Sequence, residues 1–119
     1  MKILVCGGSG FIGSAFIRNS IKKNPQDMIT NLDNLSFGSN QENLKNLENN
    51  PNYQFINNDI RNENFIQTIV KDFDVIVNFA AESHVDRSIA NPKSFIETNV
   101  LGTYSILEAI RKYDKLRKE

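Results

Sequence analysis

The sequence is poor in the residues that build disulfides and metal centres. Among its 119 residues there is one cysteine and one histidine. Cys6 has no internal disulfide partner, which is typical of a protein from a reducing cytoplasm. Because it ends the apolar run 3–5, we expect a buried structural thiol. With His84 alone and no second cluster of ligand residues, a metal site is excluded.

Long apolar stretches and an excess of one charge are also missing. The apolar run after Lys2 is too short for a signal peptide or a membrane span. Lysine and arginine number 14, and aspartate and glutamate also number 14. Without a net field we expect no nucleic-acid or membrane partner. The composition, 39% hydrophobic and 24% charged, predicts one soluble domain over 1–119 and a cytoplasmic location.

Four short apolar runs alternate with four longer segments of helical spacing. The expected strands are Lys2–Cys6, Asp27–Asp33, Asn52–Asn57 and Asp74–Ala80. The expected helices are Phe11–Lys23, a weak polar one at Asn40–Asn50, Arg61–Asp72, and a last one that Asn91-Pro92 opens and that continues through Ile110. The first of these helices has an apolar stripe of Phe11, Ile12, Ala15, Phe16 and Ile21. The second strand is less apolar, so we expect it nearer an edge. Residues 111–119 are expected to form a charged, solvated tail.

This alternation predicts an α/β fold. Right-handed strand–helix–strand crossovers produce a parallel sheet with helices on both sides. If the sheet is doubly wound, of Rossmann type, its strand order is 3-2-1-4, and a complete sheet continues with strands 5 and 6. We therefore expect an incomplete domain, truncated before those strands. An apolar edge on the fourth strand would favour self-pairing or rescue by a complementary fragment.

The stretch GGSGFIG places Gly7, Gly10 and Gly13 between the first strand and the first helix. One glycine permits a tight turn, another lets backbone amides approach a diphosphate, and the last lets the helix pack on the sheet. Free N–H groups and the helix dipole favour an anion at that point. A glycine trio alone is weak support, because a tight turn would also explain it.

Asp33, twenty residues after Gly13, strengthens the cofactor interpretation. An acidic side chain at the end of the second strand accepts hydrogen bonds from both adenosine ribose hydroxyls. The alternative is a turn residue in DNLSFGSN. Asp33 would repel a 2′-phosphate, and no Lys or Arg occurs between Lys23 and Lys45 to attract one. The predicted cofactor is therefore NAD rather than NADP.

Two further strand ends carry candidate ligand groups. Asp59 and Ile60 follow the third strand and suit the adenine amino group and ring face, although Asp59 could instead cap the next helix. The fourth strand ends in Asn78-Phe79-Ala80-Ala81-Glu82-Ser83, where small residues let the backbone approach a cofactor. Because α/β sheets bind ligands at the carboxyl ends of their strands, this convergence predicts a dinucleotide site.

The same residues resemble the extended short-chain dehydrogenase/reductase family. The resemblance rests on GGSGFIG, Asp33, NDI at Asn58–Ile60 and TNVLGT in the last helix. AAESHVDRS at Ala80–Ser88, with DNLSFGSNQENL at Asp33–Leu44, closely resembles the dTDP-glucose 4,6-dehydratase group, lyases of dTDP-rhamnose biosynthesis. Nucleotide-sugar epimerases and decarboxylases share the glycine loop and the TNVLGT-like helix.

The resemblance implies roles for individual residues. Cofactor contacts would come from Gly7, Gly10, Phe11, Ile12, Gly13, Asp33, Asn34, Leu35, Ser36, Asp59, Ile60, Phe79, Ala80, Ala81, Glu82, Ser83 and Thr98. Ser83 would also reach the nucleotide-sugar substrate, dTDP-glucose, and Asn99 would support an active-site lysine. His84 and Asp86 are expected to make structural hydrogen bonds in a loop, while Arg87 is either a loop anchor or a phosphate contact. The complete enzyme would be a homodimer that associates through the helices after strands 4 and 5.

The catalytic residues that the resemblance implies do not occur in the sequence. The family uses a Tyr-x-x-x-Lys pair and a Thr-Asp-Glu string for hydride transfer and elimination of water. None of Tyr53, Tyr104 and Tyr113 has lysine four residues later, and Thr-Asp-Glu is absent. We therefore expect an NAD-binding N-terminal portion that is inactive alone. The alternatives are a non-enzymatic NAD-binding module and a portion of a UDP-sugar epimerase or decarboxylase.

Overall fold

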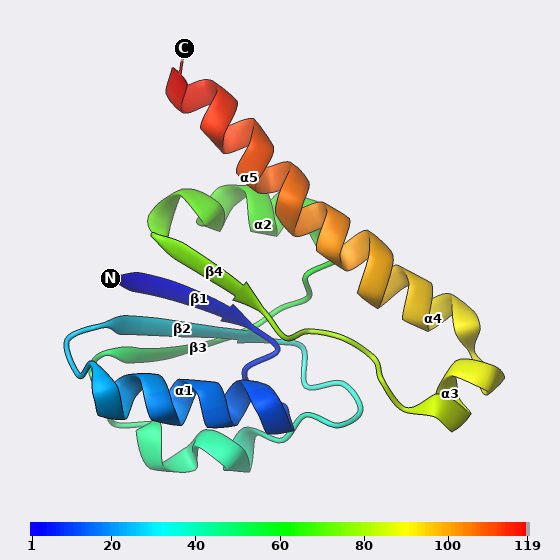
Figure 1. Cartoon of the computed structure of the whole chain (residues 1–119), viewed down its shortest axis with the longest axis horizontal. Coiled ribbons are helices and arrows are strands. Elements are labelled where there is room, and N and C mark those ends of the chain that lie inside the picture. The colour runs from blue at the N-terminus through cyan, green and yellow to red at the C-terminus, as the bar shows by residue number, and fades with distance from the viewer. Residues whose placement is uncertain (119) are drawn as a thin grey trace. The chain divides into compact units, whose positions relative to one another are not determined.

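A four-stranded parallel sheet organises the chain (Figure 1). Its strands are β1 (Lys2–Cys6), β2 (Met28–Asp33), β3 (Tyr53–Asn57) and β4 (Val75–Asn78), in the order β3-β2-β1-β4. The computed structural model describes residues 1–118, and the side chains of 1–114. The predicted parallel sheet and its strand order are confirmed, with strand limits that differ from the predicted ones by at most two residues.

The described chain divides into two compact units. The first, Met1–Asn58 with Phe73–Ala80, contains the sheet and is called the sheet unit below. The second comprises Asp59–Asp72 and the chain from Ala81 onward, and is called the helical unit.

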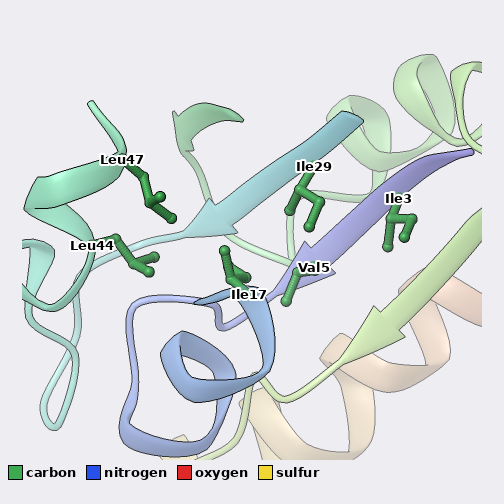
Figure 2. Packing of buried hydrophobic residues seen from close by; sticks show 6 residues of the cluster. All are labelled: Ile3, Val5, Ile17, Ile29, Leu44 and Leu47. Atoms are coloured by element: carbon green, nitrogen blue, oxygen red, sulfur yellow. The ribbon is translucent and has the colours of Figure 1, made fainter. Parts of the chain in front are cut away.

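In the sheet unit, α1 (Phe11–Lys23) and the 3₁₀ helix η1 (Gln41–Leu47) pack against one face of the sheet (Figures 1 and 2). The core shown in Figure 2 consists of Ile3, Val5, Ile17, Ile29, Leu44 and Leu47. Leu44 and Leu47 are the buried contacts of the weak polar segment, as predicted, but that segment is a short 3₁₀ helix.

The apolar stripe predicted for α1 is partly wrong. Ile17, which the prediction omitted, is completely buried, whereas Phe11 and Ile12 are 88% and 64% exposed. The buried face of the helix is formed by Gly13, Ser14 and Ile17, so the two residues that open the helix point away from the core. Apolar character alone therefore did not identify the packed face.

The prediction for β2 also needs correction. This strand was expected nearer an edge, but it lies between β1 and β3, with every residue from Ile29 to Asp33 buried. Its polar side chains tolerate burial because Asn31 and Asp33 have hydrogen-bond partners inside the sheet unit. A modest apolar content therefore does not mark an edge strand here.

The helical unit contains α2 (Glu63–Ile69), η2 (Val70–Asp72), α3 (Val85–Ala90), α4 (Pro92–Ile96), the π-helical segment η3 (Glu97–Gly102) and α5 (Thr103–Lys118). Within this unit α2 packs against α5, and Ile66, Val70, Ile106 and Ala109 are buried. No helix in the described part of the chain is long and apolar enough to cross a bilayer.

In this unit the structure settles one alternative, confirms one local prediction and corrects two, the loop at 85–90 and the tail. Asn62 rather than Asp59 caps α2, accepting a hydrogen bond from the Phe65 N–H at 3.2 Å. Residues 85–90 are helical although the sequence indicated a loop. Asn91 is the N-cap residue of α4 and Pro92 follows it in the first turn, as predicted, although the Asn91 side chain makes no capping hydrogen bond. The expected tail is helical through Lys118, because α5 continues without a break; residue 119 lies outside the described residues.

Candidate cofactor-binding site

The glycine loop after β1 is as tight as the sequence predicts. Gly7 has a φ of +75°, a conformation that residues with a Cβ rarely adopt. A Cβ at Gly7 would lie 2.5 Å from the backbone nitrogen of Ala80, and one at Gly13 would collide with the carbonyl oxygen of Gly7. The first and third glycines therefore allow backbone segments to touch, whereas Gly10 has ordinary space around it.

The amino-terminal end of α1 is available to an anion. Gly10 is the N-cap residue and supplies no side-chain hydrogen bond, and no acidic residue occurs in the first turn. The first intrahelical bond runs from the Ser14 N–H to the Gly10 carbonyl at 2.9 Å. Since the preceding N–H groups lack intrahelical partners by geometry, this end attracts negative charge.

Asp33 is bound directly to the glycine loop. It ends β2, is 4% exposed, and its Oδ2 accepts hydrogen bonds from the Ser9 N–H at 2.9 Å and the Ser39 hydroxyl at 3.2 Å. Its Oδ1 accepts one from the Leu35 N–H at 2.8 Å. Asp33 is thus a turn residue and a link to the glycine loop at the same time. A carboxylate has about four acceptor sites, so capacity for a further donor remains.

The segment after Asp33 is strained and tightly turned. Leu35 has a φ of 56°, which is uncommon for a residue with a branched side chain, and Gly38 has a φ of 90°. Asn34 accepts a hydrogen bond from the Ser36 N–H at 3.1 Å. Strain of this kind in residues other than glycine concentrates at functional sites. Asn34, Leu35 and Ser36, all predicted cofactor contacts, therefore form a distinctive turn beside Asp33.

The end of β4 meets the glycine loop. The Phe79 N–H donates to the Cys6 carbonyl at 2.8 Å, and the Phe79 ring packs on Phe16 with ring centroids 5.3 Å apart. Ala80, whose N–H bonds to the Asn78 side chain, lies against Gly7. Of the predicted contacts in the sheet unit, the structure brings Gly7 together with Phe79 and Ala80, and links Asp33 to the loop through Ser9.

Ser9 and Asn31 were missed by the sequence interpretation. The Asn31 Nδ2 donates to the Ser9 hydroxyl at 3.0 Å and to the Tyr53 hydroxyl at 3.2 Å. The Asn43 side chain donates to the Ser9 carbonyl at 3.0 Å. Burial raises the pKa of Tyr53, an effect that the hydrogen bond from Asn31 opposes. The signal available in the sequence was an asparagine in the middle of a strand.

In the helical unit, Asp59 is engaged by Arg61. The Asp59 carboxylate receives hydrogen bonds from the Arg61 backbone N–H at 2.8 Å and from its guanidinium, which also reaches Glu97 at 3.2 Å. The hydrogen bond to Asp59 raises the pKa of Arg61. Ile60 is 4% exposed and packs against Gly102, where a Cβ would lie 2.5 Å from its Cδ1.

A π-helical segment fixes the backbone around Glu82. The Asn99 side chain accepts from the Glu82 N–H at 2.8 Å and donates to the Glu82 carbonyl at 2.9 Å. The Glu82 carboxylate accepts a 2.6 Å hydrogen bond from the Ser94 hydroxyl. π segments occur frequently at functional sites. Thr98, half-buried in this segment, is adjacent to Asn99, while Ala81 and Ser83 are exposed.

The residues without an assigned role lie at the start of α3. His84 is its N-cap residue, and Asp86 and Arg87 belong to its first turns, all three exposed. Within the described residues, no group of three or more His, Cys, Asp or Glu side chains is arranged to hold a metal.

A parallel sheet in the order β3-β2-β1-β4, with a glycine loop leading from β1 into α1, defines a Rossmann-type fold. The family model described as GDP-mannose 4,6 dehydratase matches residues 4–119. The chain therefore belongs to this family.

Curated relatives and solved structures agree with that assignment. A dTDP-glucose 4,6-dehydratase of Escherichia coli is 51% identical over 115 residues, covering 95% of this chain and 32% of the relative. The structure of DesIV, a dTDP-glucose 4,6-dehydratase of Streptomyces venezuelae solved with NAD, is 42% identical with a TM-score of 0.84, covering 92% of this chain and 35% of that one. UDP-glucose 4-epimerase of Thermus thermophilus, also solved with NAD, is 30% identical with a TM-score of 0.79, covering 96% and 35%. The chain thus spans about a third of the length of the proteins it matches, in their N-terminal portion.

Proposed function

We propose that this chain is the NAD-binding portion of a dTDP-glucose 4,6-dehydratase, forming one domain over residues 1–119. The observation that carries the proposal is the link between the two sequence motifs. Asp33, the predicted ribose ligand, accepts a hydrogen bond from Ser9 of the glycine loop, the predicted diphosphate ligand. Two segments 24 residues apart in the sequence are thereby joined at the carboxyl edge of the sheet.

The residues of the sheet unit fit an adenine dinucleotide. A diphosphate is complementary to the amino-terminal end of α1, which has no side-chain cap. The absence of side chains at Gly7 and Gly13 allows the loop to pack closely against Ala80 and against the first turn of α1. Asp33 suits a ribose diol, because the Ser39 hydroxyl that donates to it can rotate away, unlike the backbone N–H donors of Ser9 and Leu35. Bound NAD would supply a nicotinamide that accepts a hydride and returns it.

The expected preference for NAD over NADP also rests on Asp33. Its carboxylate is nearly buried, so a 2′-phosphate would place negative charge next to it in a poorly solvated place. Residues Asp59, Ile60, Ala81, Glu82, Ser83 and Thr98 remain predicted cofactor contacts, and Ser83 a predicted contact of the sugar.

Isothermal titration of the chain with NAD and NADP tests the proposal. We expect NAD to bind and NADP to bind at least about tenfold more weakly. Asp33→Asn should weaken NAD binding about tenfold and reduce the difference in affinity between NAD and NADP. Glu63→Gln, an exposed acid in α2, is the control for charge alone and should leave both affinities unchanged. Absence of NAD binding by the unsubstituted chain would contradict the proposal.

We further propose that the chain has no dehydratase activity alone, because the sequence contains neither Tyr-x-x-x-Lys nor Thr-Asp-Glu. The reading frame that follows this sequence is the direct test. Thr-Asp-Glu and then Tyr-x-x-x-Lys would support the dehydratase, and a serine-containing string in place of Thr-Asp-Glu would favour an epimerase. A stop with no complementary fragment would favour a non-enzymatic NAD-binding module.

We propose a cytoplasmic homodimer for the complete enzyme. Support for association comes from the helical unit, where Ile96, Val100, Tyr104 and Leu107 each expose more than half of their surface. The residues recur every three or four positions along one continuous run of helix, which is the spacing of a packing face.

A further inference from the structure

Asn31 is a fully buried polar residue whose side chain has only one partnered end. Its Nδ2 donates to the Ser9 and Tyr53 hydroxyls, while its buried Oδ1 has no hydrogen-bond partner among the described residues. Its neighbours across the sheet are Val5 of β1 and Phe55 of β3, so the position is otherwise apolar. A buried carbonyl without a donor destabilises the folded state, and an apolar residue of similar shape would avoid that cost. The strand therefore carries an amide where packing alone favours a hydrocarbon.

The partner of Asn31 is the residue that joins the two predicted cofactor-binding segments. Ser9 belongs to the glycine loop, and its N–H donates to Asp33. Its carbonyl accepts hydrogen bonds from the Asn40 N–H at 2.9 Å and from the Asn43 side chain at 3.0 Å. Asn31 donates to the Ser9 hydroxyl and thereby anchors this junction to the middle of β2.

Gly8, the residue before Ser9 in the loop, also lies against Asn31. A Cβ at Gly8 would collide with the Asn31 Oδ1 and lie 2.5 Å from the Cδ1 of Ile17. The backbone of the loop therefore lies directly against the amide, held by a hydrogen bond at Ser9 and by close contact at Gly8.

We propose that Asn31 is a positioning residue for cofactor binding. Asn31 holds the glycine loop and the segment 33–43 in one arrangement in the ligand-free protein. The two segments therefore do not have to become ordered when the diphosphate and the ribose bind. Ordering a loop on binding costs affinity, and preorganisation removes that cost. This inference rests on the proposed function, since it assigns to Asn31 a role in binding NAD.

Three variants of the whole chain test the assignment by titration with NAD. Asn31→Leu removes the amide with little change of shape, and Ser9→Ala removes the hydroxyl that it holds. Each should raise the Kd for NAD about tenfold, the equivalent of ordering roughly one backbone residue. The double variant should bind about as well as the weaker single variant, because both changes remove one interaction. Tyr53→Phe is the matched control: it removes the other partner of Asn31, leaves Ser9 held, and should keep the Kd within about twofold.

Ligand-free measurements separate positioning from general stability. The unfolding midpoint of Asn31→Leu should stay close to that of the unsubstituted chain, because removal of the unpartnered Oδ1 offsets the loss of the hydrogen bonds to the Ser9 and Tyr53 hydroxyls. Amide hydrogen exchange should nevertheless accelerate about tenfold together in residues 7–13 and 34–43, and not in Tyr53→Phe. A merely structural role would lower the midpoint and accelerate exchange throughout the sheet.

The outcomes distinguish this inference from the proposed function. If the unsubstituted chain binds NAD and both Asn31→Leu and Ser9→Ala bind it within twofold, the positioning role is wrong while the proposed function stands. If the unsubstituted chain does not bind NAD, the proposed function fails, and unchanged exchange in the two segments would then refute the loop coupling as well. Should Asn31→Leu fail to fold, Ser9→Ala carries both measurements.

Discussion

Gly7 and Gly10 are two glycines of one loop with different physical requirements. Gly7 has a positive φ and is in contact with the backbone of Phe79 and Ala80, whereas Gly10 has an extended conformation and room for a Cβ. The repeated glycine in the sequence does not distinguish them. Backbone conformation and the approach of a distant strand end make Gly7 far less tolerant of a side chain.

We predict that Gly7→Ala lowers the free energy of unfolding by about 2–4 kcal/mol, from strain at positive φ and collision with immobile backbone atoms. Urea denaturation measures the loss. Gly10→Ala is the matched control, because its Cβ would lie 3.5 Å from the Gly7 carbonyl oxygen, an ordinary contact. Its effect should stay within about 0.5 kcal/mol. Equal losses in the two variants would contradict this explanation.

Cys6 is a buried thiol, as the sequence indicates. Burial, reinforced by the negative charge of Asp33, raises its pKa from 9.0 to about 12. Between these values the unfolded thiol loses its proton while the folded one keeps it. The folded state therefore loses stability as pH rises above 9, since the unfolded state binds fewer protons there.

We predict that the free energy of unfolding falls by about 2 kcal/mol more in the unsubstituted chain than in Cys6→Ala when pH rises from about 7 to about 10.5. Chemical denaturation at the two pH values provides the measurement. The comparison with Cys6→Ala removes the contributions of tyrosines and lysines, which titrate in both proteins. Identical pH dependence of the two proteins would show that Cys6 does not couple to folding.

Among the secondary-structure elements, the run from Pro92 to Lys118 departs most from the prediction. The sequence indicates one helix, but the structure has α4, a π segment and α5 in succession. Gly102 ends the π segment and is buried against Ile60, which follows β3 by three residues. A small residue here allows the helix to approach Ile60 closely.

We predict that Gly102→Ala lowers the stability of the chain by about 1 kcal/mol, although alanine normally favours a helix, because the Cβ overlaps the Ile60 side chain. Ile60→Val removes the nearest atom, Cδ1, and costs about 1 kcal/mol alone. In urea denaturation, the double variant should lose about 1 kcal/mol less stability than the sum of the two single losses. Simple additivity would refute the contact as the cause.

For the molecule as a whole, the helical unit presents an apolar helix face formed by Ile96, Val100, Tyr104 and Leu107, the residues that support the proposed dimer. The sheet has β4 at one end of its order, so one edge of β4 has no neighbouring strand among the described elements. Both features favour association, since the helix face exposes apolar side chains and the sheet ends at β4.

We predict that the chain self-associates in sedimentation velocity experiments at micromolar concentration, and that Val100→Lys with Leu107→Lys shifts it to monomers. Met28→Lys changes another exposed apolar residue, in the sheet unit, and should leave association intact. Persisting association of the double lysine variant would assign self-pairing to the β4 edge instead. A cooperatively unfolding monomer at all concentrations would contradict the prediction.

The order of the elements was predictable because it follows from local chemistry. Unbroken apolar runs separated by helical periodicity define strands and helices, and parallel crossovers then restrict the strand order. β1 and α1 have the predicted limits, and Cys6 is buried as predicted. Asp33 was recognisable as a candidate ligand because its distance from Gly13 reflects the length of one strand–helix–strand unit.

Hydrogen bonds between distant residues were not predictable from spacing. The anchoring of Ser9 by Asn31 and the clamp of Asn99 on Glu82 join residues 22 and 17 positions apart, and the burial of the polar side chains of β2 depends on neighbouring strands. A sequence pattern predicts that a polar residue is exposed, and such a residue is buried only where the fold places a hydrogen-bond partner next to it. The sequence thus specified the fold and the candidate ligands, while tertiary contacts determined which polar groups are buried and which segments are held together.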